Sequence, residues 1–274
     1  MKRYAFFVGL ISKKKRIAEE LKTAKALGIQ FGDNDKTLLK CPENVKEVVI
    51  PSCVTTIGKE AFKWCGNLQS VTIPDSVTSI VDGAFRGVES VKVADGNPNF
   101  YVDDSGVLID RKNKKLLYCS PSISGNYTIP DCVTYIGESA FDGCYNLQSV
   151  TIPNSVTTIG ESAFGGVPSV KVADGNPNFY VDDSGVLIDR KNKKLLHCQP
   201  SISGNYTIPD SVTTIGDWAF SGCENLQSVT IPDSVTYIGY GTFLGCKNLQ
   251  SVNIPRNCKV GNYTFPYWCK VTCR

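Results

Sequence analysis

Residues 68–90 read L-Q-S-V-T-I-P-D-S-V-T-S-I-V-D-G-A-F-R-G-V-E-S, and close variants of this phrase recur along the chain. Side chains alternate between the two faces of a strand, so Val71 and Ile73 are expected to point inward together. Pro74 then turns the chain, because proline fixes φ and has no amide hydrogen to donate to a ladder. Phe85 is the largest apolar residue of the phrase, and we expect it to be a wedge in the core.

The isoleucine before the proline marks each copy of the phrase. The markers are Ile50, Ile73, Ile129, Ile152, Ile208, Ile231 and Ile254. They follow one another at steps of 23, 56, 23, 56, 23 and 23 residues. One copy cannot bury its apolar residues alone, so the copies are expected to stack about 4.8 Å apart. A period of about 20–29 residues with an L-x-x-L-x-L core is typical of a leucine-rich repeat solenoid. The sequence therefore predicts an α/β, β-rich repeat solenoid, a right-handed superhelix with short parallel strands and an N-terminal capping helix.

A longer repeat lies over the first. Residues 91–129 and 170–208 are two copies of one 39-residue segment. The two differences between them are Tyr118 against His197 and Ser120 against Gln199. In each copy, apolar runs flank the polar stretch D-R-K-N-K, which is the pattern of a strand, a polar turn and a returning strand. Each segment is expected to insert two irregular coils or a hairpin into the stack.

The motif I-P-x-S-V-T-x-I-G-x-x-A-F-x-G-C-x-N-L resembles the BspA-type leucine-rich repeat family of bacterial and protist surface proteins, as does the interposed Y-V-D-D-S-G-V-L-I-D segment. The resemblance covers roughly residues 30–265. It implies non-enzymatic protein binding, since the family includes adhesins that bind host matrix proteins or other cells. It supplies no catalytic residues. An intracellular scaffold that binds a bacterial or host protein is the alternative function.

The charge balance and the motifs argue against several other classes of protein. Lys plus Arg is 29 and Asp plus Glu is 26, which is too balanced to predict a nucleic-acid surface. His197 is the one histidine, and Tyr118 replaces it in the other copy, so a catalytic role is not expected. The D-D-S-G runs from Asp103 and Asp182 do not have the spacing of a calcium loop and are interpreted as turns. We expect neither an enzyme nor a cofactor or metal.

The two ends differ from the repeats. Residues 1–40 hold a short apolar run with the outline of a signal peptide, but a basic run follows it directly with no small-residue cleavage site. The run is too short to span a bilayer. Helical spacing predicts an amphipathic helix over residues 13–27, which would cap the first coil, with membrane-surface binding as the alternative. The solenoid is expected over residues 41–265 and a C-terminal cap over 266–274. The location stays open between the cell surface or exterior, from the resemblance, and the cytoplasm.

The twelve cysteines follow the repeat. Cys65, Cys144, Cys223 and Cys246 occupy one equivalent slot. Slots that accept Cys, Ser or Val interchangeably are interpreted as small buried packing positions. Cys223 and Cys246 lie on adjacent coils, but a ladder need not satisfy the disulfide dihedral. Cys269 and Cys273 are the best candidates for a bridge that closes the C-terminal cap, with a zinc site as the alternative.

The strand face opposite the core is the candidate protein-binding surface. The residues assigned to it are Ser70, Thr72, Asp75, Ser149, Thr151, Asn154, Ser228, Thr230 and Asp233. A flat or concave docking face is what solenoids use for binding, although β-propensity and cross-strand pairing explain the same residues. The face has few aromatic anchors, so modest affinity is expected.

The turn side is a second candidate surface, because aromatic residues vary there while the scaffold stays constant. These residues are Tyr135, Trp218, Tyr237 and Tyr240. The predicted partner on either surface is a protein, and the chain itself is expected to be a monomer.

Overall fold

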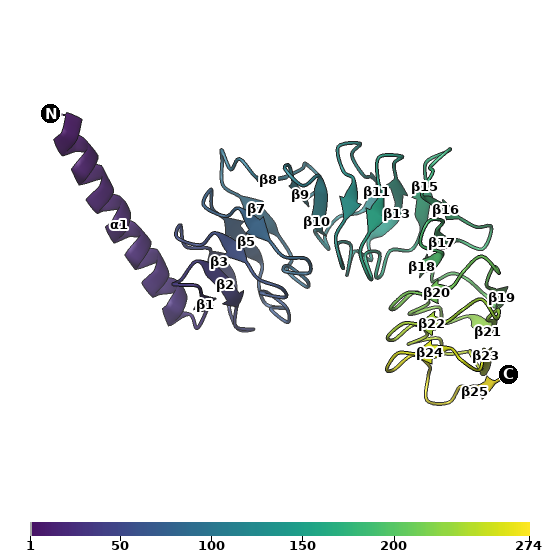
Figure 1. Ribbon diagram of the computed structural model, residues 1–274. Helices are drawn as coiled ribbons and strands as arrows, with labels where there is room; N and C mark the ends of the chain where they lie inside the picture. Colours follow the sequence, from purple (N-terminus) through teal and green to yellow (C-terminus); the bar gives the residue numbers. More distant parts are fainter. Residues whose placement is uncertain (1) are drawn as a thin grey trace. The chain divides into compact units, whose positions relative to one another are not determined.

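The structure is a computed structural model that describes residues 2–274, with side chains from Ser12 onward. The N-terminal helix α1 spans Lys2–Ala26, and strands make up the regular structure that follows it (Figure 1). The helix thus begins earlier than the predicted range 13–27. The signal-like apolar run falls within residues 1–11, so its side chains lie outside the described part of the chain.

The helix ends where its sequence allows the chain to turn. Gly28 has a φ of 85°, a left-handed conformation that glycine adopts without a Cβ penalty. The Gly28 N–H donates to the Lys25 carbonyl, and the Ile29 N–H donates to the Ala24 carbonyl at 3.1 Å. These bonds satisfy carbonyls of the last turn that have no partner within the helix.

The chain divides into two compact units, Met1–Pro121 and Ser122–Arg274. The strands of the first unit are β1 (Gln30–Gly32), β2 (Thr37–Lys40), β3 (Glu47–Val49), β4 (Thr56–Ile57), β5 (Ser70–Ile73), β6 (Ser79–Ile80), β7 (Val91–Val93), β8 (Phe100–Val102), β9 (Val107–Asp110) and β10 (Lys115–Cys119).

In the second unit, β11–β18 repeat the order of β3–β10, and β19–β25 follow them. Its strands are β11 (Gly125–Thr128), β12 (Tyr135–Ile136), β13 (Leu147–Ile152), β14 (Thr158–Ile159), β15 (Val170–Val172), β16 (Phe179–Val181), β17 (Val186–Asp189), β18 (Lys194–Cys198), β19 (Gly204–Thr207), β20 (Thr214–Ile215), β21 (Leu226–Thr230), β22 (Tyr237–Ile238), β23 (Ser251–Ile254), β24 (Lys259–Val260) and β25 (Lys270–Cys273).

Strands from successive repeats pair in parallel, which makes each unit a β-solenoid. In the first unit the order is β3-β5-β7, and in the second the orders are β11-β13-β15 and β19-β21-β23-β25. The other side of each coil carries two-residue strands that also stack in parallel, such as β4 on β6 and β20 on β22. That side therefore consists of turns and a second ladder of short strands.

The 39-residue segments interrupt this pattern with antiparallel strands. β8 pairs with β9, and β9 pairs with β10; in the second copy β16, β17 and β18 pair in the same way. Of the two expectations for these segments, the structure shows the hairpin, extended by a third strand. That third strand, Phe100–Val102 in the first copy, was not foreseen.

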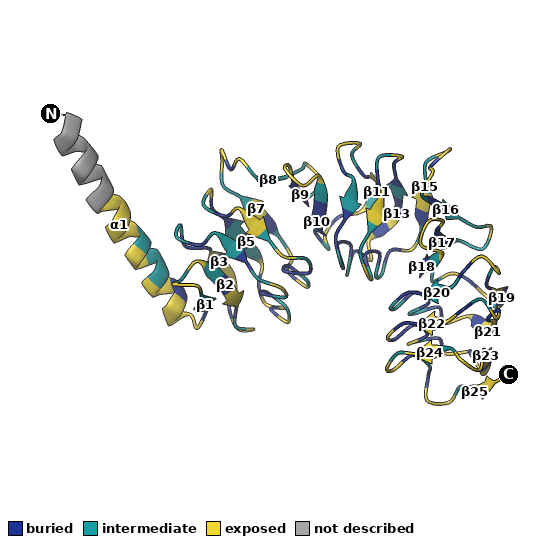
Figure 2. Ribbon diagram, viewed as in Figure 1, coloured by how far each residue is buried: buried dark blue, intermediate teal, exposed yellow. Residues whose placement is uncertain are grey.

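The core is a column of residues from equivalent positions. Val71 and Ile73 are fully buried, as the alternation predicts. The phenylalanines stack face to face between coils, with ring centroids 5.4 Å apart for Phe62 and Phe85 and 5.1 Å apart for Phe220 and Phe243. Figure 2 shows strands that carry both buried and exposed residues, while the tips of the turns are exposed. The prediction of a phenylalanine wedge in each coil is confirmed.

Candidate protein-binding surfaces

The parallel register lines up the outward residues of the sheet in rows. In the first unit, Thr72 of β5 lies beside Val49 of β3 and Lys92 of β7. Ser70 lies beside Glu47. Each outward residue alternates with a buried one, so the rows cover the face of the sheet that points away from the core.

The second unit carries two further rows of threonine. Thr151 lies between Thr128 and Lys171. Thr230 belongs to the row Thr207, Thr230, Asn253 and Thr272. Thr230 is exposed and Thr151 is half-buried. The structure therefore brings the predicted threonines into regular rows along the sheet, one per strand.

The serine positions are less accessible than the threonine positions. Ser149 is 3% exposed, and its hydroxyl donates to Asn126 Oδ1 at 2.7 Å. Ser228 donates to Asn205 in the same way, at 2.7 Å, and is half-buried. The 39-residue segments supply both asparagines. The hydroxyls of Ser149 and Ser228 are therefore engaged in hydrogen bonds within the sheet. Ser149 offers little surface to a partner.

The polar residues that follow the strands lie at the rim of the face. Asp75 and Asn154 are exposed. The Asp233 side chain is 84% exposed, and its Oδ1 accepts a hydrogen bond from Arg274 Nε at 2.9 Å. An exposed pair of this kind contributes about 0–1 kcal/mol to stability, so these carboxylates remain available for a partner.

The turn side of the second unit carries an aromatic cluster. The Trp218 and Tyr240 rings are 5.2 Å apart, and the Tyr240 and Tyr263 rings are 5.6 Å apart. Tyr263 was missed in the sequence analysis, although it occupies the same slot as Trp218, two residues before the phenylalanine of the stack. Tyr135 and Tyr237 lie instead in the short strands β12 and β22.

The slot that holds Trp218 and Tyr263 has an unusual backbone. Both residues have positive φ, 59° and 53°, and glycine occupies the same slot at Gly83 and Gly241. A bulky residue in this conformation is uncommon and strained by roughly 1–3 kcal/mol. Two members of the aromatic cluster, Trp218 and Tyr263, are therefore held at a backbone position where the other repeats place Glu, Ser or Gly.

The residues considered for chemistry have structural contacts. His197 is buried against Phe164, with ring centroids 6.1 Å apart, and burial lowers its pKa to about 4. Asp103 Oδ1 accepts the amides of Ser105 and Val107, which is turn capping. Within residues 2–274, no group of three or more His, Cys, Asp or Glu side chains is placed to hold a metal ion.

The shared slot of Cys65, Cys144, Cys223 and Cys246 is a buried packing position inside the coils, whereas Cys132 is exposed. Burial raises the pKa of Cys41 to about 12, and the Cys65 thiol donates to the Cys41 carbonyl at 3.3 Å. The expected bridge between Cys269 and Cys273 is wrong, since both are thiols in the structure. Cys269 directly precedes β25 and Cys273 ends it, so four extended residues separate them by about 13 Å, whereas a disulfide needs Cα atoms within about 7 Å.

The family model described as BspA type leucine rich repeat region matches the chain in six copies. The matched ranges are residues 34–101, 113–180 and 196–272, which together make up more than half of the chain. A comparison with curated proteins gave no match. Within the described residues, α1 and the rest of the chain include no helix with the length and apolar character needed to cross a membrane.

Several solved structures resemble this chain. A leucine-rich repeat protein from Eubacterium ventriosum is 27% identical, with a TM-score of 0.53, over 84% of this chain and 60% of that one. A leucine rich cell surface protein from Faecalibacterium prausnitzii is 23% identical, with a TM-score of 0.48, over 82% and 61%. The pneumococcal vaccine antigen PcpA is 19% identical, with a TM-score of 0.46, over 81% and 64%. The chain spans less than two thirds of the length of each of these structures. The first likeness supports the repeat fold.

Proposed function

The chain belongs to the BspA-type leucine-rich repeat family, and from this membership we propose that it is a non-enzymatic, adhesin-like module that binds a protein at the cell surface or outside the cell. The observation that carries the proposal is the set of outward rows, in which Thr230 and its neighbours repeat once per strand. A regular, extended face of this kind suits a broad protein surface, as in other solenoids.

The composition of the face sets the expected strength of binding. Lys92 and Lys171 end the threonine rows, and Asp75 and Asp233 lie at the rim, so charges of both signs surround small hydroxyls. Aromatic and arginine anchors, which usually contribute most of the binding energy, are few on this face. The expected partner is a host matrix protein or a protein of a neighbouring cell, held with modest affinity.

A charge placed on the rows tests the proposal. Immobilised protein is offered a panel of purified matrix and cell-surface proteins, and binding is compared between the wild type, Thr230→Glu and Thr151→Glu. Thr158→Glu is the matched control, because Thr158 is also exposed but lies in β14, on the other side of the coil. Loss of binding in the first two variants, with an unchanged melting temperature, supports the proposal; equal loss in the control contradicts it.

An intracellular scaffold is the second candidate function. Buried thiols such as Cys41, Cys65, Cys223 and Cys246 suit a reducing compartment. The intact mass of the protein from its native cell, with and without thiol alkylation, separates the two candidates. A shortened N-terminus means export and favours the adhesin, whereas an uncleaved chain with alkylatable cysteines favours the scaffold.

A further inference from the structure

Strand β3 is an edge strand with main-chain groups that face away from the sheet. The Lys46 carbonyl accepts from Gln69, and the Ile50 N–H donates to Thr72, so these groups point toward β5. The direction alternates along a strand, which turns the N–H and C=O groups of Glu47 and Val49 toward the open edge. The order β3-β5-β7 places no strand on that side among the described residues.

Helix α1 covers the end of the core beside β3 without pairing with the strand. Ala24 and Ile29 are buried, at 3% and 4% exposure. Glu20 Oε2 accepts a hydrogen bond from the Ser52 N–H at 2.8 Å, which fastens the helix to the turn after the strand. The outward side chain of Val49 is nevertheless 69% exposed. The cap therefore protects the core but leaves the edge of β3 open.

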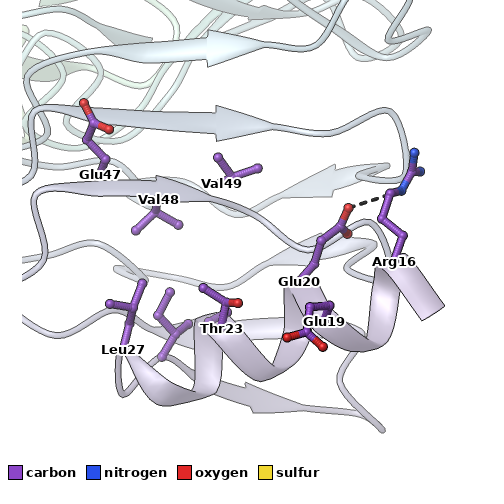
Figure 3. Close-up of a pocket in the computed structure, with 10 residues that line it drawn as sticks. Arg16, Glu19, Glu20, Thr23, Leu27, Glu47, Val48 and Val49 are labelled. Carbon is purple, nitrogen blue, oxygen red and sulfur yellow. Dashed lines mark ion pairs between the residues drawn. The ribbon is translucent and has the colours of Figure 1, made fainter. Parts of the chain in front are cut away.

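A groove of about 520 Å³ lies between the helix and the strand. Its apolar wall includes Ala24, Leu27, Ile29 and Val48. Figure 3 shows the last turns of the helix facing the strand that carries Glu47, Val48 and Val49, with Leu27 on the strand side. The volume falls in the range of about 300–1,000 Å³ found for ligand pockets, and the open edge is as long as the three residues of β3.

The charged side chains around the groove indicate which charge a bound partner should carry. Glu19, Glu20 and Glu47 line it, against the single cation Arg16. Arg16 Nε lies 3.4 Å from Glu20 Oε1, and Lys22 Nζ lies 3.8 Å from Glu19 Oε1, so each of these carboxylates has a cation beside it and Glu47 is the lining carboxylate that keeps the groove acidic. Glu47 is exposed, so it acts on an incoming charge through solvent, and a basic residue opposite it is favoured.

We propose that this groove binds an extended, basic peptide segment of another protein, which adds to β3 as one more parallel strand. A lysine or arginine of the segment lies opposite Glu47, the next residue is aliphatic and enters the apolar wall beside Val48, and the residue after it lies outward beside Val49. The protein's own strand β7 shows that this sheet accepts such a pattern, since Val91-Lys92-Val93 pairs with β5 in parallel. Glu47 and Val49 also begin the outward rows of the sheet, but main-chain pairing along the open edge of β3 is the basis of recognition at this site.

The test uses the capped synthetic peptide Ser-Val-Lys-Val-Thr-Val-Ser, labelled with a fluorophore, and the full chain. Binding is measured by fluorescence anisotropy, and amide hydrogen exchange is followed at Glu47 and Val49. We expect saturable binding, slower exchange at these two amides, and about tenfold weaker binding when the peptide lysine is replaced by glutamate.

Two variants make the test specific. Val49→Pro removes an N–H that faces the open edge and leaves the bonds to β5 in place, so we expect binding to be lost. Glu47→Lys is expected to reverse the preference, with the glutamate peptide bound more tightly than the lysine peptide, an outcome that a misfolded variant cannot give. Asp104→Lys is the charge control, because Asp104 is exposed in the turn between β8 and β9.

Three results would overturn the proposal: the two peptides bind equally, Glu47→Lys leaves the preference unchanged, or no protection develops at Glu47 and Val49. A second copy of the chain is the competing occupant. Sedimentation that shows self-association of the wild type, abolished by Val49→Pro, together with no peptide binding, would assign the groove to that second copy instead.

Discussion

The two 39-residue segments share all but two residues, yet they fill one buried site with different chemistry. The Tyr118 hydroxyl donates to the Val88 carbonyl at 2.7 Å, and its ring lies 6.0 Å from Phe85. The ring of His197, at the equivalent position, lies 6.1 Å from Phe164, and its buried Nε2 has no hydrogen-bond partner among the described residues. Both side chains therefore pack on the phenylalanine of the preceding coil.

The difference lies in ionisation. The phenol of Tyr118 is neutral at ordinary pH, but an imidazole can take up a proton. Burial lowers the pKa of His197 to about 4, because the folded site does not solvate the charged ring. The same packing site is thus insensitive to pH in one copy and sensitive in the other.

The largest expected effect comes from the shared part of the site. Phe85→Ala and Phe164→Ala each remove a ring that is 2% exposed and stacked on a second phenylalanine, so each should lower the free energy of unfolding by about 3–5 kcal/mol. Urea unfolding at neutral pH measures both variants. Because the surroundings match, the two losses should agree within about 1 kcal/mol; a loss below about 1 kcal/mol in either would mean that the coil collapses around the cavity.

The intermediate effect separates the two copies. Above about pH 6.5, His197 is neutral in both the folded and the unfolded chain, so it adds no pH dependence. As the pH is lowered from about 6.5 to about 4, the unfolded chain takes up a proton that the folded site rejects. The free energy of unfolding therefore decreases over this range, by about 3 kcal/mol in total. His197→Tyr copies the first segment and should remove this part of the acid sensitivity.

The control for this prediction is the reverse change, Tyr118→His, which should add a second acid-sensitive site. Urea midpoints at several pH values between 4 and 8 measure all three proteins. If the wild type and His197→Tyr lose stability in parallel over this range, the ring is solvated in the folded state, and the assignment of a buried neutral imidazole fails.

The repeat made much of this fold predictable. The repeat period and the alternation of side chains along a strand place Val71 inward and Thr72 outward. Neither signal depends on which coil is the neighbour. The duplication also argued against a catalytic role for His197, since Tyr118 replaces it in the first copy, and the structure packs both rings in the core. Positions whose environment is the same in every coil can be predicted from one coil.

The features that could not be predicted from the sequence arise where a coil lacks a regular neighbour. Ser149 is buried because Asn126, from the 39-residue segment, lies beside it and accepts its hydroxyl. The open edge of β3 depends on how α1 packs, which no repeat position encodes. The antiparallel strand β8 likewise has no counterpart in the regular coil, so the period could not predict it.

The smallest expected effect concerns the second differing position. Ser120 donates to the Glu89 carbonyl of the preceding coil at 2.8 Å, whereas Gln199 Nε2 donates to Ser184 within its own segment at 3.1 Å. Gln199→Ser loses one hydrogen bond, but the shorter hydroxyl can donate to the Pro168 carbonyl as Ser120 does to that of Glu89. The free energy of unfolding should therefore change by about 1 kcal/mol or less, measured by urea unfolding at pH 7. A loss above about 2 kcal/mol would show that the carboxamide, which lies over Gly185, protects main-chain groups that serine leaves unsatisfied.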